Sequence, residues 1–163
     1  MQSRKKDNII FIRLFPDEDL HEKLREVCRL YGVKTAVVLS GLGQLKKFKL
    51  GYLKEKGNYT PEKFDKPHEL LALTGNICLQ KEGYELHLHA TLGDEKKNAI
   101  GGHLIEGKVE VTNEIVLLKT NIAVTRRPEE KTGLKGMFLE GFGTELTGSD
   151  SHSKNIMKKC NRK

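Results

Sequence analysis

Hydrophobic and polar residues alternate strictly over residues 86–92, whose sequence is LHLHATL. A period of two residues is typical of a β-strand, because successive side chains point to opposite faces of the sheet. The pattern predicts a strand with one aliphatic face and one face that carries His87 and His89. A third histidine, His103, follows after a polar turn and a Gly-Gly pair. Glycines let a backbone pass close to its neighbours, so His103 can approach the other two.

A helical period occurs early in the chain. Apolar residues recur there at intervals of three or four, as on the buried side of an amphipathic helix: they are Leu20, Leu24, Val27 and Tyr31. The acidic residues at 17–19 offer N-terminal caps, and Gly32 offers a C-terminal stop. We expect this helix to cover a sheet, with His21 on its polar side.

The other hydrophobic segments predict strands separated by turns. We expect them at 8–14, 34–40, 45–53, 69–79, 99–105, 114–119 and 121–125, with a short closing segment at 134–139. Residues 34–40 are nearly all apolar, which predicts a central strand covered on both faces. Residues 54–67 are charged and rich in turn formers, and we expect a loop there.

These elements predict an α+β fold: a mixed, mainly antiparallel β-sheet with one clear helix. The order of strand, helix and strand in residues 8–40 predicts one crossover connection. One helix is too little to cover both faces of such a sheet. We therefore expect part of the sheet to be buried against a partner.

The formal net charge of the 163-residue chain is +7, and the positive charge lies at the two ends. Residues 1–7 hold three basic residues and one acidic residue, residues 149–163 hold five and one, and the region between them is nearly balanced. The apolar period ends near residue 140. We therefore expect a basic N-terminal arm (1–7), one domain (8–140) and a flexible basic C-terminal tail (141–163).

Cysteine content and hydropathy indicate where the protein works. Its three cysteines are far apart and odd in number, which argues for a reducing compartment. No apolar run reaches the roughly 18 residues of a transmembrane helix, and the N-terminus lacks the pattern of a secretory signal. We expect a cytoplasmic protein with no membrane partner.

The three histidines 87, 89 and 103 are candidate metal ligands. Residues two apart on a strand lie about 6–7 Å apart on the same face, so two neutral imidazoles can reach one ion. Three imidazoles are typical of an open zinc site, and nitrogen ligands disfavour magnesium and calcium. Three further side chains are candidates for orienting the imidazoles: Thr91, Asp94 and Glu106. The alternative interpretation is a group of solvent-exposed histidines without an ion.

The paired histidines of 86–92 and the following Gly101–Leu104 resemble the signature of the plants-and-prokaryotes conserved (PPC) domain. Further matches occur in order: Arg13-Leu14 with Asp19-Leu20, residues 36–43 and residues 69–77. The resemblance covers residues 8–139 and is to the prokaryotic stand-alone type, which has no AT-hook. It implies a trimer-forming domain, a homotrimer, and a DNA-binding or regulatory role.

In the plant members of that family an AT-hook with an Arg-Gly-Arg-Pro core contacts DNA, and this core is absent here. The tripeptide Arg126-Arg127-Pro128 lacks the glycine and precedes two glutamates, which repel phosphate. The DNA-binding residues are therefore unknown. Only the basic ends offer generic phosphate contacts: Arg4, Lys5, Lys6, Lys154, Lys158, Lys159, Arg162 and Lys163.

Two other functions remain open from the sequence. A metal-dependent enzyme or a small-ligand-binding protein would use the same three histidines, although no catalytic residues are identifiable. A pure interaction module would need no metal.

Overall fold

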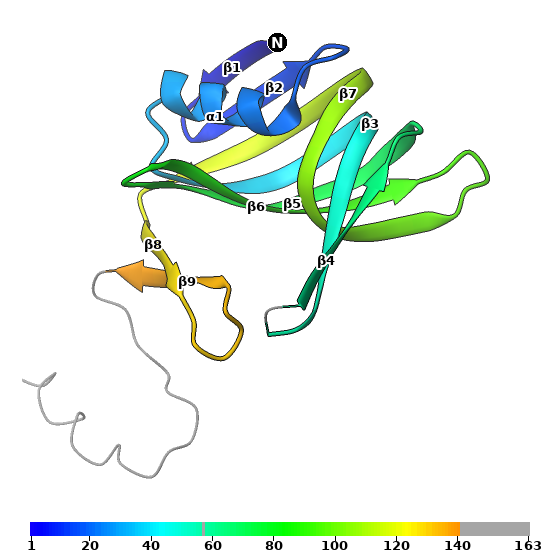
Figure 1. The fold of residues 1–163 in the computed structure, drawn as a ribbon. Coiled ribbons are helices and arrows are strands. Elements are labelled where there is room, and N and C mark those ends of the chain that lie inside the picture. Colours follow the sequence, from blue (N-terminus) through cyan, green and yellow to red (C-terminus); the bar gives the residue numbers. More distant parts are fainter. Residues whose placement is uncertain (57, 141–163) are drawn as a thin grey trace, which may run out of the picture.

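The computed structural model describes residues 1–56 and 58–140, which form nine strands and one helix (Figure 1). The strands are β1 (Gln2–Lys6), β2 (Ile9–Leu14), β3 (Thr35–Glu55), β4 (Asn58–Phe64), β5 (His68–Gln80), β6 (Gly83–Gly93), β7 (Ala99–Thr120), β8 (Ala123–Pro128) and β9 (Lys135–Glu140). The helix α1 spans Leu20–Leu30. Seven strands form one sheet in the order β1-β2-β7-β6-β5-β3-β4, and β8 and β9 form a separate hairpin.

The two longest strands, β3 with 21 residues and β7 with 22, hold the sheet together. The sequence predicted two strands in each of these regions, but each pair is one continuous strand. Register shifts, such as the one between Val38 and Ser40, interrupt the alternation in β3. β3 also pairs directly with β7, which closes the β3-β5-β6-β7 part of the sheet on itself.

Every strand pairing in residues 1–56 and 58–140 is antiparallel. β2 and β3 run in the same direction, but β7 lies between them: Phe11 pairs with Val116, and Val116 pairs with Ser40. The crossover through α1 therefore connects two strands that do not touch. The sheet is antiparallel, and the mixed character expected for it is absent from the described strands.

The helix α1 begins, ends and packs as its apolar period predicted. The Asp19 side chain accepts a hydrogen bond from the backbone N–H of Glu22 at 2.9 Å, and Gly32 follows the last turn with a φ of +54°. The buried residues of α1 pack on those of β2: Leu20, Leu24, Val27 and Cys28 on the helix, and Ile10, Ile12 and Leu14 on the strand. Figure 1 shows α1 on one side of the sheet, and the core lies on this side.

Two segments expected to be irregular are strands. Residues 2–6 pair with β2 as β1, so the segment 1–7 is not a free arm. The expected loop at 54–67 contains β4, an edge strand that pairs with β3. Pro61 is tolerated in β4 because one side of an edge strand needs no hydrogen bonds. The predicted tail, 141–163, lies outside the described residues.

The outer face of β2, β7 and β3 is apolar and is not covered within the described chain. Val37 and Leu39 of β3 are 40% and 50% exposed, so the strand expected to be covered on both faces is covered on one. Phe11 and Leu42 are also exposed and, with Val116, line a groove that has a volume of about 880 Å³. No helix in the described part of the chain is long and apolar enough to cross a membrane.

Candidate metal centre

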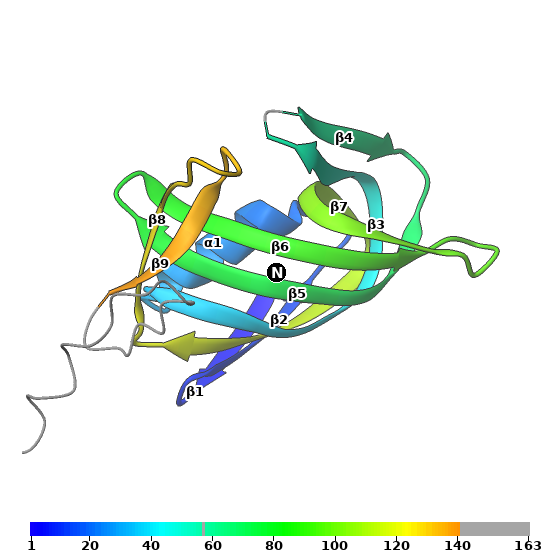
Figure 2. The same ribbon diagram turned by 90° about the horizontal axis from the view of Figure 1, so that it is seen from below.

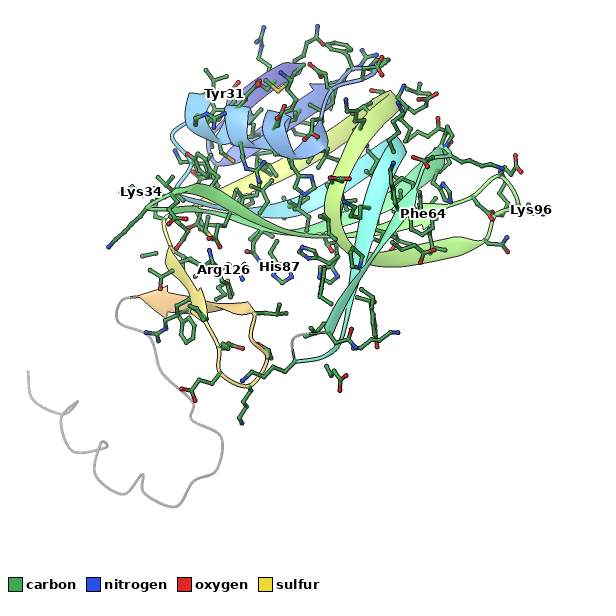
Figure 3. All side chains as sticks on the ribbon, in the orientation of Figure 1. Tyr31, Lys34, Phe64, His87, Lys96 and Arg126 are labelled. Atoms are coloured by element: carbon green, nitrogen blue, oxygen red, sulfur yellow. The ribbon has the colours of Figure 1, made fainter. Side chains whose placement is uncertain are left out.

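The two faces of β6 differ as the alternating segment predicted. Leu88, Ala90 and Leu92 are buried in the core, while His87 and His89 are exposed on the opposite face. Figure 3 shows His87 on the side of the sheet away from α1. The period of two residues therefore directs both imidazoles away from the core.

His103 reaches the same place from β7. It lies directly opposite His89 in the β6–β7 ladder, so the two side chains point to one face. A Cβ atom at Gly101 or Gly102 would lie 3.0 Å from a backbone carbonyl oxygen of β6 or β3, respectively. The close backbone approach predicted for the Gly-Gly pair is therefore present.

The three imidazoles converge on one point. One ring nitrogen of each residue lies within 4.8 Å of those of the other two, and the Nε2 atoms of His87 and His89 are 3.2 Å apart. The ring centroids are 5.2, 5.2 and 5.4 Å apart. Two nitrogens bound to one ion at 2.0–2.1 Å are at most about 4 Å apart. Small rotations of the rings thus suffice to share an ion, and the donor set fits a transition metal.

Burial favours the neutral form of two of these imidazoles, which is the form that binds metal. Burial, with smaller effects from the charges of Arg126 and His89, lowers the pKa of His87. Burial lowers the pKa of His103 to about 4, and the other histidines nearby contribute less. Both rings therefore carry a free lone pair at neutral pH.

Two hairpins form the walls of a cleft of about 1000 Å³ around the histidines. Figures 1 and 2 show the β3–β4 and β8–β9 hairpins on the side of the sheet away from α1. The Tyr59 hydroxyl packs directly over Gly51 of β3. A Cβ atom at position 51 would occupy the same space as this hydroxyl. The Tyr59 ring stands edge-on to His103, with 6.2 Å between centroids. Its buried hydroxyl has no hydrogen-bond partner among the described residues.

A glutamine side chain fastens the β8–β9 hairpin to the sheet. Gln80 Nε2 donates to the carbonyl oxygen of Val124 at 3.1 Å, and Gln80 Oε1 accepts from the backbone N–H of Arg126 at 2.9 Å. The Arg126 guanidinium donates to Oδ1 of Asn76, which is opposite His87 in the β5–β6 ladder. Arg126 lies near enough to His87 for its charge to lower the pKa of that histidine, and Figure 3 shows both on the side of the sheet away from α1. These hydrogen bonds hold a cation at the edge of the histidine cluster.

The sequence profile of the Plants and Prokaryotes Conserved domain, abbreviated PCC or PPC, matches residues 1–121. The chain belongs to this family. The resemblance drawn from the histidine signature is therefore confirmed, and β1 is part of the PCC domain. The profile ends before β8, so the hairpin that carries Arg126 lies beyond the matched residues.

Two curated relatives of the PCC-domain chain are called Bifunctional protein GlmU, from Synechococcus sp. strains JA-2-3B'a(2-13) and JA-3-3Ab. They are 33% and 30% identical over 131 residues. The match covers 79% of this chain but 20% of each relative. The chain thus spans about a fifth of the length of these relatives.

Solved structures share the fold. The plant- and prokaryote-conserved protein of Pyrococcus horikoshii is 28% identical with a TM-score of 0.73, and the match covers 88% of this chain and 96% of that one. A metal-containing protein of Archaeoglobus fulgidus is 26% identical with a TM-score of 0.73, over 82% and 95%. A protein of Bacteroides thetaiotaomicron described as a predicted DNA-binding protein has a TM-score of 0.78 over 84% and 96%, at 24% identity, which shows the fold alone.

The side chains considered for orienting the imidazoles make no hydrogen bond to them in residues 1–56 and 58–140. Asp94 accepts hydrogen bonds from the backbone and side chain of Asn98, and so closes the β6–β7 turn. Glu106 forms an ion pair with Lys49 at 3.2 Å. Thr91 is exposed on the face of β6 that carries the histidines.

His21 is buried, and its expected position on the polar side of α1 is wrong. Its side chain is 8% exposed, and its Nε2 lies 3.1 Å from the carbonyl oxygen of Leu104. The helix lies so close to β7 that this side chain is enclosed, and burial lowers its pKa. His68, by contrast, lies against the rings of Phe48 and Phe64 outside the cleft.

The basic residues considered for phosphate contacts fall into two groups. Arg4, Lys5 and Lys6 lie on β1 and are exposed. The others lie outside the described residues: Lys154, Lys158, Lys159, Arg162 and Lys163.

Sequence reasoning missed two residues of the cleft, Tyr59 and Arg126. Tyr59 lies in the segment expected to be a loop, and Arg126 was considered only as part of a tripeptide compared with an AT-hook. A weak signal for the hairpin exists, because apolar residues occur on both sides of the turn at 129–133. No local pattern shows that this hairpin folds back over the histidine face of β6 and β7.

Proposed function

We propose that this PCC-domain protein binds one transition-metal ion through His87, His89 and His103 and presents it to a small molecule in the cleft. The observation that carries the proposal is the convergence of one nitrogen from each ring within 4.8 Å. Zinc is the favoured ion, because three imidazoles without a carboxylate are typical of open zinc sites. The metal-containing relative from A. fulgidus, 26% identical, supports a metal in this fold.

A bound zinc ion would supply Lewis-acid chemistry to a molecule in the cleft. The chain itself supplies the three nitrogen ligands, a wall that includes Tyr59, and the Arg126 cation. A small-ligand-binding protein and a metal-dependent enzyme both fit this arrangement. The open side of the cleft distinguishes it from a closed structural zinc site, in which the protein provides all four ligands.

Elemental analysis of untagged protein tests the metal site. We expect about one ion per chain in the unmodified protein and a loss of most of it in His89→Ala and His103→Ala. His68→Gln is the control, since it changes an imidazole that contacts Phe48 and Phe64 outside the cleft. Equal metal content in all four proteins would disprove the site.

We also propose that the protein is a cytoplasmic homotrimer assembled through the apolar face of β2, β7 and β3. Exposed Phe11, Val37 and Leu42 support a partner on this face. The thiols of Cys28 and Cys78 form no disulfide within the described residues, which fits a reducing compartment. Light scattering after size exclusion should give a trimer. Phe11→Glu should dissociate it, whereas Ile122→Glu, an exposed apolar position outside this face, should not.

A second candidate function is DNA binding, favoured by the exposed basic residues Arg4, Lys5 and Lys6 at the edge of the sheet. Deleting residues 1–7 would remove β1, so substitutions are the better test. In the test variant, glutamine replaces the basic residues of both ends: Arg4, Lys5, Lys6, Lys154, Lys158, Lys159, Arg162 and Lys163. Anisotropy with duplex DNA should then show weaker binding and a smaller salt dependence. Unchanged affinity would exclude these residues as the DNA contact.

A further inference from the structure

Arg126 is a cation without a carboxylate partner in the described part of the chain. Its guanidinium donates to Oδ1 of Asn76, and its Nη1 lies 3.5 Å from the carbonyl oxygen of Lys135. Both acceptors are neutral, so no described residue compensates the charge of Arg126. An uncompensated guanidinium with a fixed position is a ready binding group for an oxyanion, because its fork of N–H groups matches two oxygens.

The charges around Arg126 strengthen this preference. Among the described residues that line the cleft, Glu85 is the one carboxylate, and it is ion-paired with Lys135. Lys49 also lines the cleft and pairs with Glu106. Imidazole ligands carry no negative charge that would neutralise a bound metal, so a divalent ion on the histidines would make the cleft more positive. A small molecule that enters the cleft is therefore favoured if it carries negative charge.

The remainder of the lining suits an organic molecule rather than a bare inorganic ion. The cleft has a volume of about 1000 Å³, which is at the upper end of the range for small-molecule sites. Apolar side chains from β3, β6, β7 and the β8–β9 turn line it: Leu53, Leu86, Ile105 and Leu134. The aromatic ring of Tyr59, edge-on to His103, adds a further wall against which an organic ligand can pack.

We propose that the cleft binds a small organic oxyanion, a carboxylate or a phosphate ester, whose charged group pairs with Arg126 and whose apolar part lies against the apolar side chains that line the cleft. This inference rests on the proposed function in one respect: it takes the metal site as the floor of the cleft. It assigns ligand selection to the β8–β9 hairpin, which lies beyond the residues that the PCC profile matches.

Adjacent arginines provide a matched control. Arg127 carries the same charge, but its guanidinium stacks on the Phe138 ring at 3.7 Å from the ring centroid, and Arg127 does not line the cleft. Arg126→Ala and Arg127→Ala therefore remove the same net charge from neighbouring positions. The backbone hydrogen bond from residue 126 to Gln80 remains in both variants, and Arg126→Gln additionally keeps a side-chain donor for Asn76.

Calorimetric titration of the full zinc-loaded chain with benzoate, phenyl phosphate and benzamide tests the proposal. Benzoate and phenyl phosphate distinguish a carboxylate from a phosphate site, and benzamide is the neutral counterpart of benzoate. We expect at least one oxyanion to bind the unmodified protein and Arg127→Ala equally, and to bind Arg126→Ala and Arg126→Gln roughly 10- to 100-fold more weakly. Benzamide should bind weakly to all four proteins.

Three results would overturn the proposal: no oxyanion binds, both alanine variants lose affinity equally, or Arg126 variants bind as well as the unmodified protein. Metal content measured on the same samples, and titration of chains stripped with EDTA, separate this proposal from the metal site. Zinc without Arg126-dependent binding contradicts the oxyanion site alone. Arg126-dependent binding by a chain that never takes up metal contradicts the metal site alone.

Discussion

The two faces of β6 share one backbone and have opposite roles. Leu88, Ala90 and Leu92 are buried in the core, whereas His87 and His89 face the cleft. The aliphatic face stabilises the fold because it removes apolar surface from water. The histidine face buries little surface, and its imidazoles are available to bind a metal ion. A shift of one residue in register would exchange the two faces, so core packing also fixes where the imidazoles point.

The largest expected effect compares substitutions at two consecutive residues, one on each face of β6. Leu88→Ala should lower the free energy of unfolding of metal-free protein by about 2–5 kcal/mol, because it leaves a cavity at a fully buried position. His89→Ala, next in the chain and exposed, should change it by less than about 0.5 kcal/mol. Urea unfolding in EDTA measures both. Equal losses would mean that the two faces do not divide the roles in this way.

A smaller effect is expected where β5 touches β6 behind His87. Gly75 has a φ of +141°, and a Cβ atom there would collide with the carbonyl oxygen of His87. Gly75→Ala should therefore cost about 1–3 kcal/mol of stability and reduce zinc content by displacing His87. Gly83→Ala is the control, since Gly83 has a φ of +122° but open space around it. If both variants behave alike, backbone strain and not the close approach accounts for the loss.

The smallest effect concerns pH and the core side of the sheet. Burial lowers the pKa of His21 below its usual 6.5. The hydrogen bond with the carbonyl oxygen of Leu104 opposes this shift, and the charges of Asp19, Arg25 and Glu106 have smaller effects. As the pH falls, His21 therefore binds a proton in the unfolded chain before it does so in the folded one. The contribution of His21 to stability is constant above about pH 6.5 and decreases as the pH falls below that value. His21→Gln cannot take up a proton and should show a shallower decrease between pH 7.5 and 5.5.

Urea unfolding of both proteins in EDTA at these two pH values measures the difference. His87 and His103 are present in both proteins, and His21 has only the smallest of the effects on the pKa of His103, so the difference between the two profiles reports mainly on His21. Parallel pH profiles would show that His21 contributes no proton linkage.

Much of the fold and the histidine pair could be predicted because local patterns specify them. The alternation in 86–92 placed His87 and His89 on one face, and the apolar period of 20–31 with its caps placed α1. Periodicity is a property of neighbouring residues, and the core requires it wherever an element has one buried face.

The long strands, the edge strands and the second wall of the cleft could not be predicted in the same way. Register shifts hide the continuity of β3, and β1 and β4 are edge strands with few buried residues. Tyr59 and Arg126 have no special local pattern. They reach the cleft because their hairpins pack against distant strands.

The sequence by itself determined which side chains share a face: the paired imidazoles, the aliphatic side of the same strand and the buried side of the helix. Only the tertiary structure decided that His103 lies opposite His89, that His21 is enclosed, and that Arg126 lies near His87. The physical reason is range. The period of a strand or helix follows from its own backbone geometry, whereas contact between distant segments depends on ladder register and hairpin docking, which the whole core decides at once.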